Sequence, residues 1–204
     1  MKSQTIDNLI YERQLNAKGL IRLAGVDEVG RGCLAGPVLT ACVELPLNDI
    51  IEGVTDSKLL SPAKREKLYE QIISKATQYH IGIVSPQQID KINILNATKL
   101  AMTSCIEQMQ DIDCVLIDAV CLKATKFPTF SLVKGDLLSY LIASASIVAK
   151  VTRDRLMQEL SAKYPFYDFA SNKGYGTAKH ITALKRYGFC EIHRKTFITH
   201  FTNV

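Results

Sequence analysis

Short apolar runs separated by polar and glycine-rich segments recur along the chain, which is typical of strands and helices that alternate around a sheet. The runs rich in β-branched and apolar residues predict strands at 21–26, 38–45, 80–84, 114–117 and 129–133. A glycine-rich turn joins the first two runs. We therefore expect these two strands to be neighbours and to lie in the centre of the sheet.

Helices are predicted where a capping residue precedes apolar positions at helical spacing. Ser61 and Pro62 predict a helix start, because serine caps helices and proline suits the first helical position, and this helix is expected to run to about Lys75. A short helix is predicted at 86–92 and longer ones at 93–109 and 137–160. In the helix at 93–109 the predicted apolar positions are Leu95, Leu100, Met102, Ile106 and Met109.

The chain changes character after residue 160. Tyr164 and Pro165 break the preceding helix, a group of aromatic residues follows, and the sequence KGYG predicts a turn before Thr177 caps a last helix. No internal repeat, low-complexity tract or linker is evident. We therefore predict a main domain over 1–160, built on an α/β or α+β sheet, in close contact with a small C-terminal helical segment over 161–204.

Composition changes this picture only modestly. The 204 residues carry a net charge of +5 and are 47% hydrophobic, which allows a sizeable core and gives a mild preference for polyanions. The six cysteines form no C-x-x-C pair, so we expect free thiols in a cytoplasmic protein. No apolar stretch suits a signal peptide or a membrane helix, and we expect no membrane association.

Four acidic residues follow predicted strands, namely Asp27, Glu28, Asp118 and Asp136. If these acids converge at one edge of the sheet, their mutual repulsion is tolerable only with divalent cations between them. Mg²⁺ and Mn²⁺ prefer such oxygen ligands, and two ions can activate a water and stabilise the leaving oxygen of a phosphodiester. The pattern therefore points to metal-dependent phosphoryl hydrolysis. The alternative for an isolated acid is a turn or helix cap.

Eight short motifs occur in one order along the chain. They are DEVGRG at 27–32, LAGPV at 34–38, DSK at 56–58, VLID at 115–118, KGD at 134–136, ASIVAKVTRDRLM at 145–157, KGYGT at 173–177 and HRKTF at 193–197. Together they make the chain from 21 to 197 resemble the type 2 ribonucleases H, and among these the bacterial ribonuclease HII family. The related ribonuclease HIII family carries a lysine-type variant of the GRG element and usually an extra N-terminal domain, so ribonuclease HII is the better match.

The resemblance implies a ribonuclease H-like fold, a mixed sheet flanked by helices. The catalytic domain would cover 1–160, and the segment 161–204 would complete the substrate groove. The implied activity is hydrolysis, with two Mg²⁺ or Mn²⁺ ions, of the phosphodiester on the 5′ side of a ribonucleotide, which leaves a 3′-hydroxyl and a 5′-phosphate. The implied substrates are RNA/DNA hybrids and single ribonucleotides embedded in duplex DNA.

The resemblance also assigns roles to individual residues. Asp27, Glu28, Asp118 and Asp136 would be the metal-binding, catalytic carboxylates. Gly30, Arg31 and Gly32 would read the ribose 2′-hydroxyl at close range, chiefly through backbone groups, because this hydroxyl is what separates RNA from DNA. Tyr175 would pack against the deoxyribose that follows the ribonucleotide, and Ser57 and Lys58 would contact phosphate or serve the structure. Two departures are Cys33, where a proline is common, and Ala119, where a glycine is common.

Two other functions compete with this interpretation. A ribonuclease H-like junction resolvase would use the same carboxylates to cut DNA without requiring a 2′-hydroxyl, but the GRG and KGYGT motifs argue against it. A basic nucleic-acid-binding module with structural acids would bind independently of metal ions. No oligomer interface or protein partner is evident from the sequence, and we expect a monomer.

Overall fold

A computed structural model describes the protein over residues 8–123 and 125–201, so residues 1–7, 124 and 202–204 of the two predicted segments lie outside the described part. Its centre is a five-stranded sheet in the order β3-β2-β1-β4-β5. The strands are β1 (Leu23–Val29), β2 (Val38–Glu44), β3 (Gln78–Val84), β4 (Cys114–Asp118) and β5 (Thr129–Leu132). The first three are antiparallel neighbours, whereas β4 runs parallel to both β1 and β5. The predicted mixed sheet with two central strands is confirmed.

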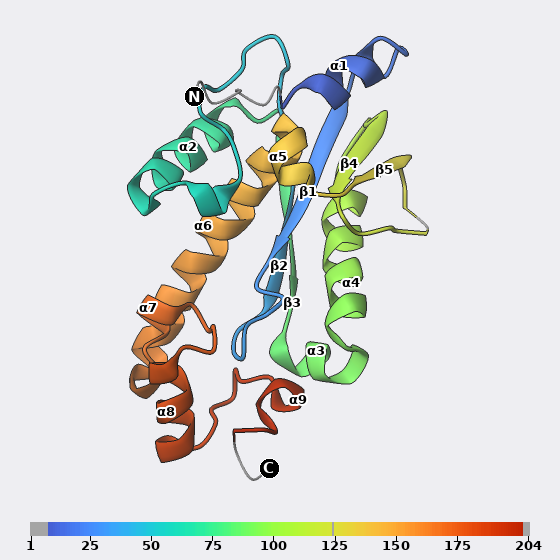
Figure 1. The fold of residues 1–204 in the computed structure, drawn as a ribbon. Coiled ribbons are helices and arrows are strands. Elements are labelled where there is room, and N and C mark those ends of the chain that lie inside the picture. Colours follow the sequence, from blue (N-terminus) through green and yellow to red (C-terminus); the bar gives the residue numbers. More distant parts are fainter. Residues whose placement is uncertain (1–7, 124, 202–204) are drawn as a thin grey trace, which may run out of the picture.

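Two long helices cover opposite faces of the sheet (Figure 1). The helix α6 (Tyr140–Lys163) packs on β1 and β2, and α4 (Ile94–Glu107) packs on β2 and β3. The helix α2 (Pro62–Lys75) packs against α6, while α3 (Pro86–Ile92) leads into α4. A short helix, α1 (Ile10–Asn16), precedes the sheet. Among the described residues, no helix is long and apolar enough to cross a membrane.

The alternation of side chains along the strands fixes which residues face each helix. Leu23 on β1 belongs to the apolar cluster under α6, whereas Ala24 and Val26 belong to the cluster under α4. Continued alternation places Asp27 on the α6 side. The sheet therefore buries an acid against the helix that covers it.

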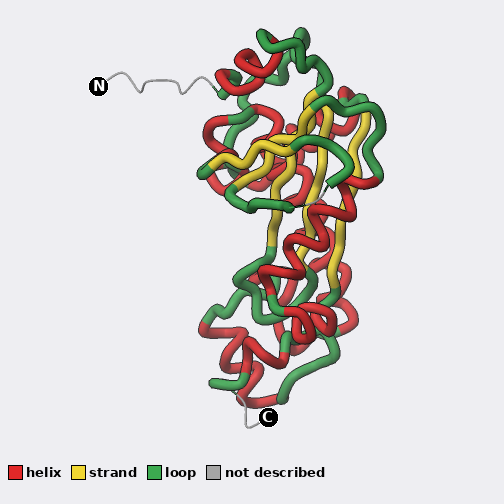
Figure 2. The backbone as a smooth tube through the Cα atoms, turned by 90° about the vertical axis from the view of Figure 1, so that its right-hand side faces the viewer, coloured by secondary structure: helices red, strands yellow, loops and turns green. Residues whose placement is uncertain are grey.

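The C-terminal segment forms short elements at one end of the molecule, below the sheet in Figure 2. They are η2 (Pro165–Tyr167), α7 (Phe169–Asn172), α8 (Ala178–Tyr187) and α9 (Lys195–Ile198). Their apolar side chains share one cluster with Leu34, Ala35 and Met157 from the main part of the chain. The predicted division at residue 160 falls inside α6, which continues to Lys163.

Several local predictions were wrong. The first strand is shifted toward the C-terminus, so Asp27 and Glu28 lie within β1 rather than after it. The helix predicted at 137–160 is two helices, α5 (Gly135–Leu138) and α6, because Ser139 is extended and caps the second one. Leu95 and Leu100 are 46% and 47% exposed and supply nothing to the core. The predicted polar start contains α1, whose buried Glu12 accepts a hydrogen bond from Ser139.

Candidate active site

The sheet brings Asp27 and Asp118 together. The strands β1 and β4 are parallel, and their last paired residues are Val26 and Ile117. The two aspartates follow directly at neighbouring positions on the same face. Side chains at the carboxyl ends of parallel strands are where ligands commonly bind in open sheets.

Asp136 joins this pair from α5. The backbone N–H of Gly135 donates a hydrogen bond to Asp118 Oδ1 at 2.7 Å, which fixes the start of α5 beside the end of β4. Lys58 Nζ lies 3.5 Å from Asp136 Oδ2 and 3.9 Å from Asp56 Oδ1. Because the Lys58 side chain is 76% exposed, its ammonium group can leave this position at little cost.

The acids oppose one another electrostatically. Burial raises the pKa of Asp27 well above its ordinary value, and the neighbouring Glu28 and Asp118 carboxylates raise it further. Burial likewise raises the pKa of Glu28, although Arg31 counteracts this. The pKa of Asp118 is raised by burial and by Asp136, against the Gly135 hydrogen bond. A cation bound between these groups would relieve both the desolvation and the repulsion.

The carboxylates offer free oxygen for such a cation. Glu28 Oε2 is buried and accepts no hydrogen bond from any described residue, while Oε1 is 3.2 Å from Arg31 Nη1. Asp27 Oδ1 instead accepts the backbone N–H of Glu28 at 2.7 Å. Over residues 8–123 and 125–201, no three His, Cys, Asp or Glu side chains are arranged as a metal-ligand set. The donor chemistry fits Mg²⁺ or Mn²⁺, but the side chains do not form a closed ligand shell.

The two glycines of the GRG turn differ in the space around them. Gly30 has a φ of +91°, and a Cβ there would collide with the Arg153 side chain. A Cβ at Gly32, in contrast, would meet no described atom within 4 Å. Arg31 between them is exposed and pairs with Glu28. The turn therefore presents an uncovered stretch of backbone next to the acids.

The KGYGT turn lies against the GRG turn. The backbone N–H groups of Leu34 and Ala35 donate to the carbonyl oxygen of Gly174 at 2.8 and 3.3 Å. Tyr175 is 39% exposed, and partial burial raises the pKa of its phenol. Two of the predicted substrate-binding elements, 140 residues apart in sequence, are thus side by side.

Ser57 and Lys58 of the DSK motif point in different directions. Ser57 is 3% exposed, and its hydroxyl is 2.8 Å from that of Ser146 on α6. Ser146 in turn lowers the pKa of Asp27, against the larger effect of burial. Ser57 therefore lies on the buried side of the acids, where it contacts Ser146. Lys58 approaches the acids from the solvent side.

Two buried arginines that the sequence analysis did not single out hold these turns. Arg153 donates hydrogen bonds to the carbonyl oxygens of Ala35, Pro37 and Lys173. Arg194 donates to those of Gly30, Arg31 and Gly36. Both lie inside quoted motifs, but nothing in the residue pattern distinguishes an arginine that binds carbonyl groups from one at the surface.

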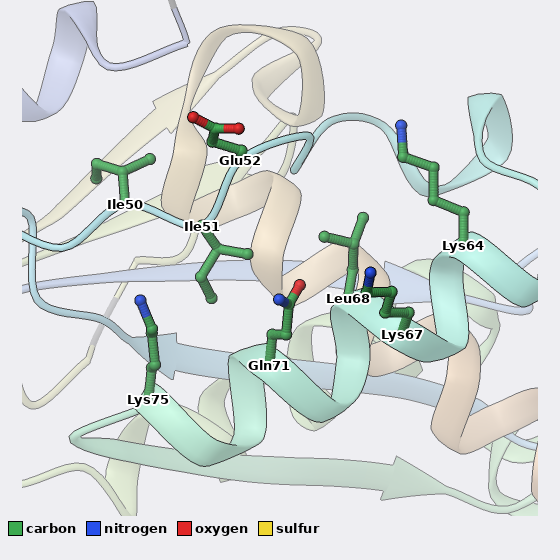
Figure 3. Close-up of a pocket in the computed structure, with 8 residues that line it drawn as sticks. All are labelled: Ile50, Ile51, Glu52, Lys64, Lys67, Leu68, Gln71 and Lys75. Atoms are coloured by element: carbon green, nitrogen blue, oxygen red, sulfur yellow. The ribbon is translucent and has the colours of Figure 1, made fainter.

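A cavity elsewhere shows that concavity alone does not locate the chemistry. It has a volume of about 450 Å³ and lies between α2 and the segment 50–52. Figure 3 shows the side chains around it, which are Ile50, Ile51, Glu52, Lys64, Lys67, Leu68, Gln71 and Lys75. None of them is a predicted site residue.

Comparisons with known proteins agree with this geometry. The sequence profile described as Ribonuclease HII matches residues 24–204. The ribonuclease HII of Ruminiclostridium cellulolyticum is 52% identical over 194 residues, which are 95% of this chain and 76% of the relative. That of Bacillus cereus (strain Q1) is 50% identical over 200 residues, with 96% and 76% covered.

Solved structures are similar as well. The ribonuclease H2 of Pyrococcus horikoshii OT3 has a TM-score of 0.74 at 27% identity, with 88% of this chain and 98% of that chain covered. The ribonuclease HII in the PCNA complex from Archaeoglobus fulgidus has a TM-score of 0.74 at 28% identity, with 85% and 93% covered. The predicted ribonuclease H-like fold is confirmed.

Proposed function

The chain belongs to the ribonuclease HII family, whose members are type 2 ribonucleases H acting as endonucleases on RNA/DNA, and from this we propose the details of its reaction. The enzyme hydrolyses the phosphodiester on the 5′ side of a ribonucleotide and leaves a 3′-hydroxyl and a 5′-phosphate. Its substrates are RNA/DNA hybrids and single ribonucleotides embedded in duplex DNA.

We assign the metal site to Asp27, Glu28, Asp118 and Asp136. The observation that supports the proposal is the repulsion within this group: besides burial, Glu28 and Asp118 raise the pKa of Asp27, Asp118 raises that of Glu28, and Asp136 raises that of Asp118. One Glu28 oxygen is also buried and unpartnered. Two bound Mg²⁺ or Mn²⁺ ions would activate a water and stabilise the leaving oxygen. The chain's own contribution is to hold the four carboxylates near the carboxyl end of β4, beside the central strand β1.

We assign substrate discrimination to the two adjoining turns. The open backbone at Gly32 leaves room for a ribose to approach, so that backbone groups of Gly30, Arg31 and Gly32 can reach its 2′-hydroxyl. The exposed part of the Tyr175 ring packs against the next sugar, where a deoxyribose fits better than a ribose. Lys58 adds a phosphate contact, and Ser57 acts through Ser146 on Asp27.

The six free cysteines support a cytoplasmic location, since a reducing compartment keeps thiols unpaired. We retain the expectation of a monomer. We keep the proposal of a catalytic domain, 1–160, and a groove-completing segment, 161–204. The role of the second segment in the groove is supported by the hydrogen bonds from the Leu34 and Ala35 N–H groups to the Gly174 carbonyl oxygen.

The decisive experiment maps the products from a DNA duplex that contains one ribonucleotide. It is run with Mg²⁺, Mn²⁺ or EDTA, beside an all-DNA duplex and a uniform hybrid. A cation-dependent cut on the 5′ side of the ribonucleotide supports the proposal. Cutting of the all-DNA duplex would favour a resolvase-like enzyme, and EDTA-resistant binding without cleavage would favour a binding module.

A further inference from the structure

Two buried histidines are joined side chain to side chain next to the KGYGT turn. His180 is the third residue of α8, and His193 lies between α8 and α9. Their Nε2 atoms are 3.0 Å apart. At the outer ends, His180 Nδ1 is 2.8 Å from the carbonyl oxygen of Tyr175, and His193 Nδ1 accepts the backbone N–H of Cys190 at 2.9 Å.

These partners determine where each proton sits. His193 Nδ1 faces the Cys190 N–H, so it must be the unprotonated nitrogen, and the proton of His193 is on Nε2. That proton is donated to His180 Nε2, which leaves the proton of His180 on Nδ1, where it is donated to the Tyr175 carbonyl group. An additional proton on either imidazole would place two N–H groups against each other, at the Cys190–His193 contact or at the His193–His180 contact.

The surroundings oppose such a proton. His180 is fully buried and His193 is 3% exposed, and the rings of Tyr167 and Phe169 pack against both. The nearest titratable groups are the Cys190 thiol, 3.1 Å from His193 Nδ1, and the Tyr167 phenol.

Charged groups nearby do not offset this. Among the described residues, no carboxylate bonds to either imidazole; Asp168 pairs with Lys179, and Glu191 with Lys163 and Tyr164. The neighbouring buried charges, Arg153 and Arg194, are positive. Burial, together with His180, lowers the pKa of His193 to about 4, and burial lowers that of His180.

We propose that the His180–His193 pair, with one proton on each ring, positions the Tyr175 carbonyl group and thereby the ring that senses the sugar after the ribonucleotide. The role of Tyr175 rests on the proposed function. The same carbonyl oxygen also accepts the Thr177 N–H at 2.8 Å, so His180 supplies the second of two donors that fix its direction. His180 and His193 are positioning residues, since neither contacts the acids.

The first test does not depend on activity. Long-range ¹H–¹⁵N spectra of the full chain at pH 7 should show His180 protonated on Nδ1 and His193 on Nε2. On acidification His193 should not titrate down to pH 5, and the pKa of His180 should lie below its ordinary value. Any other pair of tautomers, or titration of either ring near its ordinary pKa of about 6.5, overturns the proposal. This result stands even if the wild-type enzyme cleaves no ribonucleotide, which would defeat the proposed function alone.

The second test uses a conservative rescue. His180→Leu removes the donor to the Tyr175 carbonyl group, whereas His180→Asn keeps an N–H near the position of Nδ1. The control is His80→Gln, which replaces a histidine on β3, outside the C-terminal segment. Relative kcat/KM for a deoxyribose over a ribose after the cleaved ribonucleotide should fall roughly fivefold in the Leu variant, about 1 kcal/mol, and recover in the Asn variant. The Tyr175 ring resonances should shift in parallel. Wild-type preference and unshifted Tyr175 resonances in a folded Leu variant would overturn the proposal; if that variant does not fold, the tautomers decide.

Discussion

Arg194 Nη2 donates a hydrogen bond to the carbonyl oxygen of Gly30 at 2.7 Å, across 164 residues of sequence. The same guanidinium also binds the carbonyl oxygens of Arg31 and Gly36. It is fully buried and contacts no carboxylate in the described residues, and burial lowers its pKa to about 10. The C-terminal segment thus fixes the backbone conformation of the GRG turn through this guanidinium group. Such a fork of donors is what distinguishes arginine from lysine.

Replacement of Arg194 by lysine should therefore be costly even though the charge is kept. Lysine cannot reach three carbonyl groups, and its ammonium would be buried with unsatisfied partners, so we expect the free energy of unfolding to fall by about 3 kcal/mol. Urea denaturation measures this. Arg155→Lys is the matched control, because Arg155 is 46% exposed and pairs at the surface with Glu66 and Glu70. Equal stability of the two variants would contradict the assigned role.

The two glycines of the GRG turn should separate folding from catalysis. Gly32→Ala fills open space, so its stability should change by less than about 0.5 kcal/mol, while cleavage falls on the order of 10- to 100-fold because the ribose is displaced. Gly30→Ala should instead lose about 2 kcal/mol of stability, since its φ is +91° and the new Cβ meets Arg153. Parallel urea and cleavage assays test this. Wild-type cleavage by Gly32→Ala would remove the basis for close approach.

Asp27→Asn should abolish cleavage and stabilise the metal-free fold. Asp27 has a raised pKa, so its ionised form destabilises the folded state, and a neutral amide should raise the free energy of unfolding. Thermal unfolding in EDTA gives the sign, and added Mg²⁺ should stabilise the wild type only. The control is Asp113→Asn, which should destabilise, because the Ile21 and Arg22 N–H groups lower the pKa of Asp113. A loss of stability in both variants would rule out repulsion at Asp27.

A further prediction concerns Ala119, the residue after Asp118. It has a φ of +49°, in the left-handed region that favours glycine. Ala119→Gly should raise the free energy of unfolding by about 0.5–1 kcal/mol, the relief of strain exceeding the added entropy of the unfolded chain. The urea midpoint measures this. Ala63→Gly within α2 should shift it the opposite way; a downward shift in both would show that Ala119 is unstrained.

The sequence predicted what depends on local pattern. Alternating apolar residues located the strands, and serine followed by proline located the start of α2, where Ser61 does accept the Lys64 N–H. Local pattern also selected Asp27 and Asp118, because each follows an apolar run. In the structure the preceding residues, Val26 and Ile117, are paired. Buried Arg153 could not be found this way, since its partners are carbonyl groups 20 to 118 residues away. Every residue type carries the same backbone carbonyl group, so the sequence does not mark these partners.

The His180–His193 pair is a similar long-range feature, and it has a measurable dependence on pH. The pKa of His193 is about 4 in the folded state and near 6.5 when unfolded, so between these values the unfolded chain binds more protons. The contribution of neutral His193 to the free energy of unfolding is therefore complete above pH 6.5. It is lost as the pH falls toward 4, by up to about 3 kcal/mol. The raised carboxyl pKa values of Asp27, Glu28 and Asp118 act in the opposite direction. Urea denaturation at pH 7 and pH 4.5 should thus show a smaller loss for His193→Gln than for the wild type, with His80→Gln unchanged; equal losses in all three would mean that His193 titrates normally.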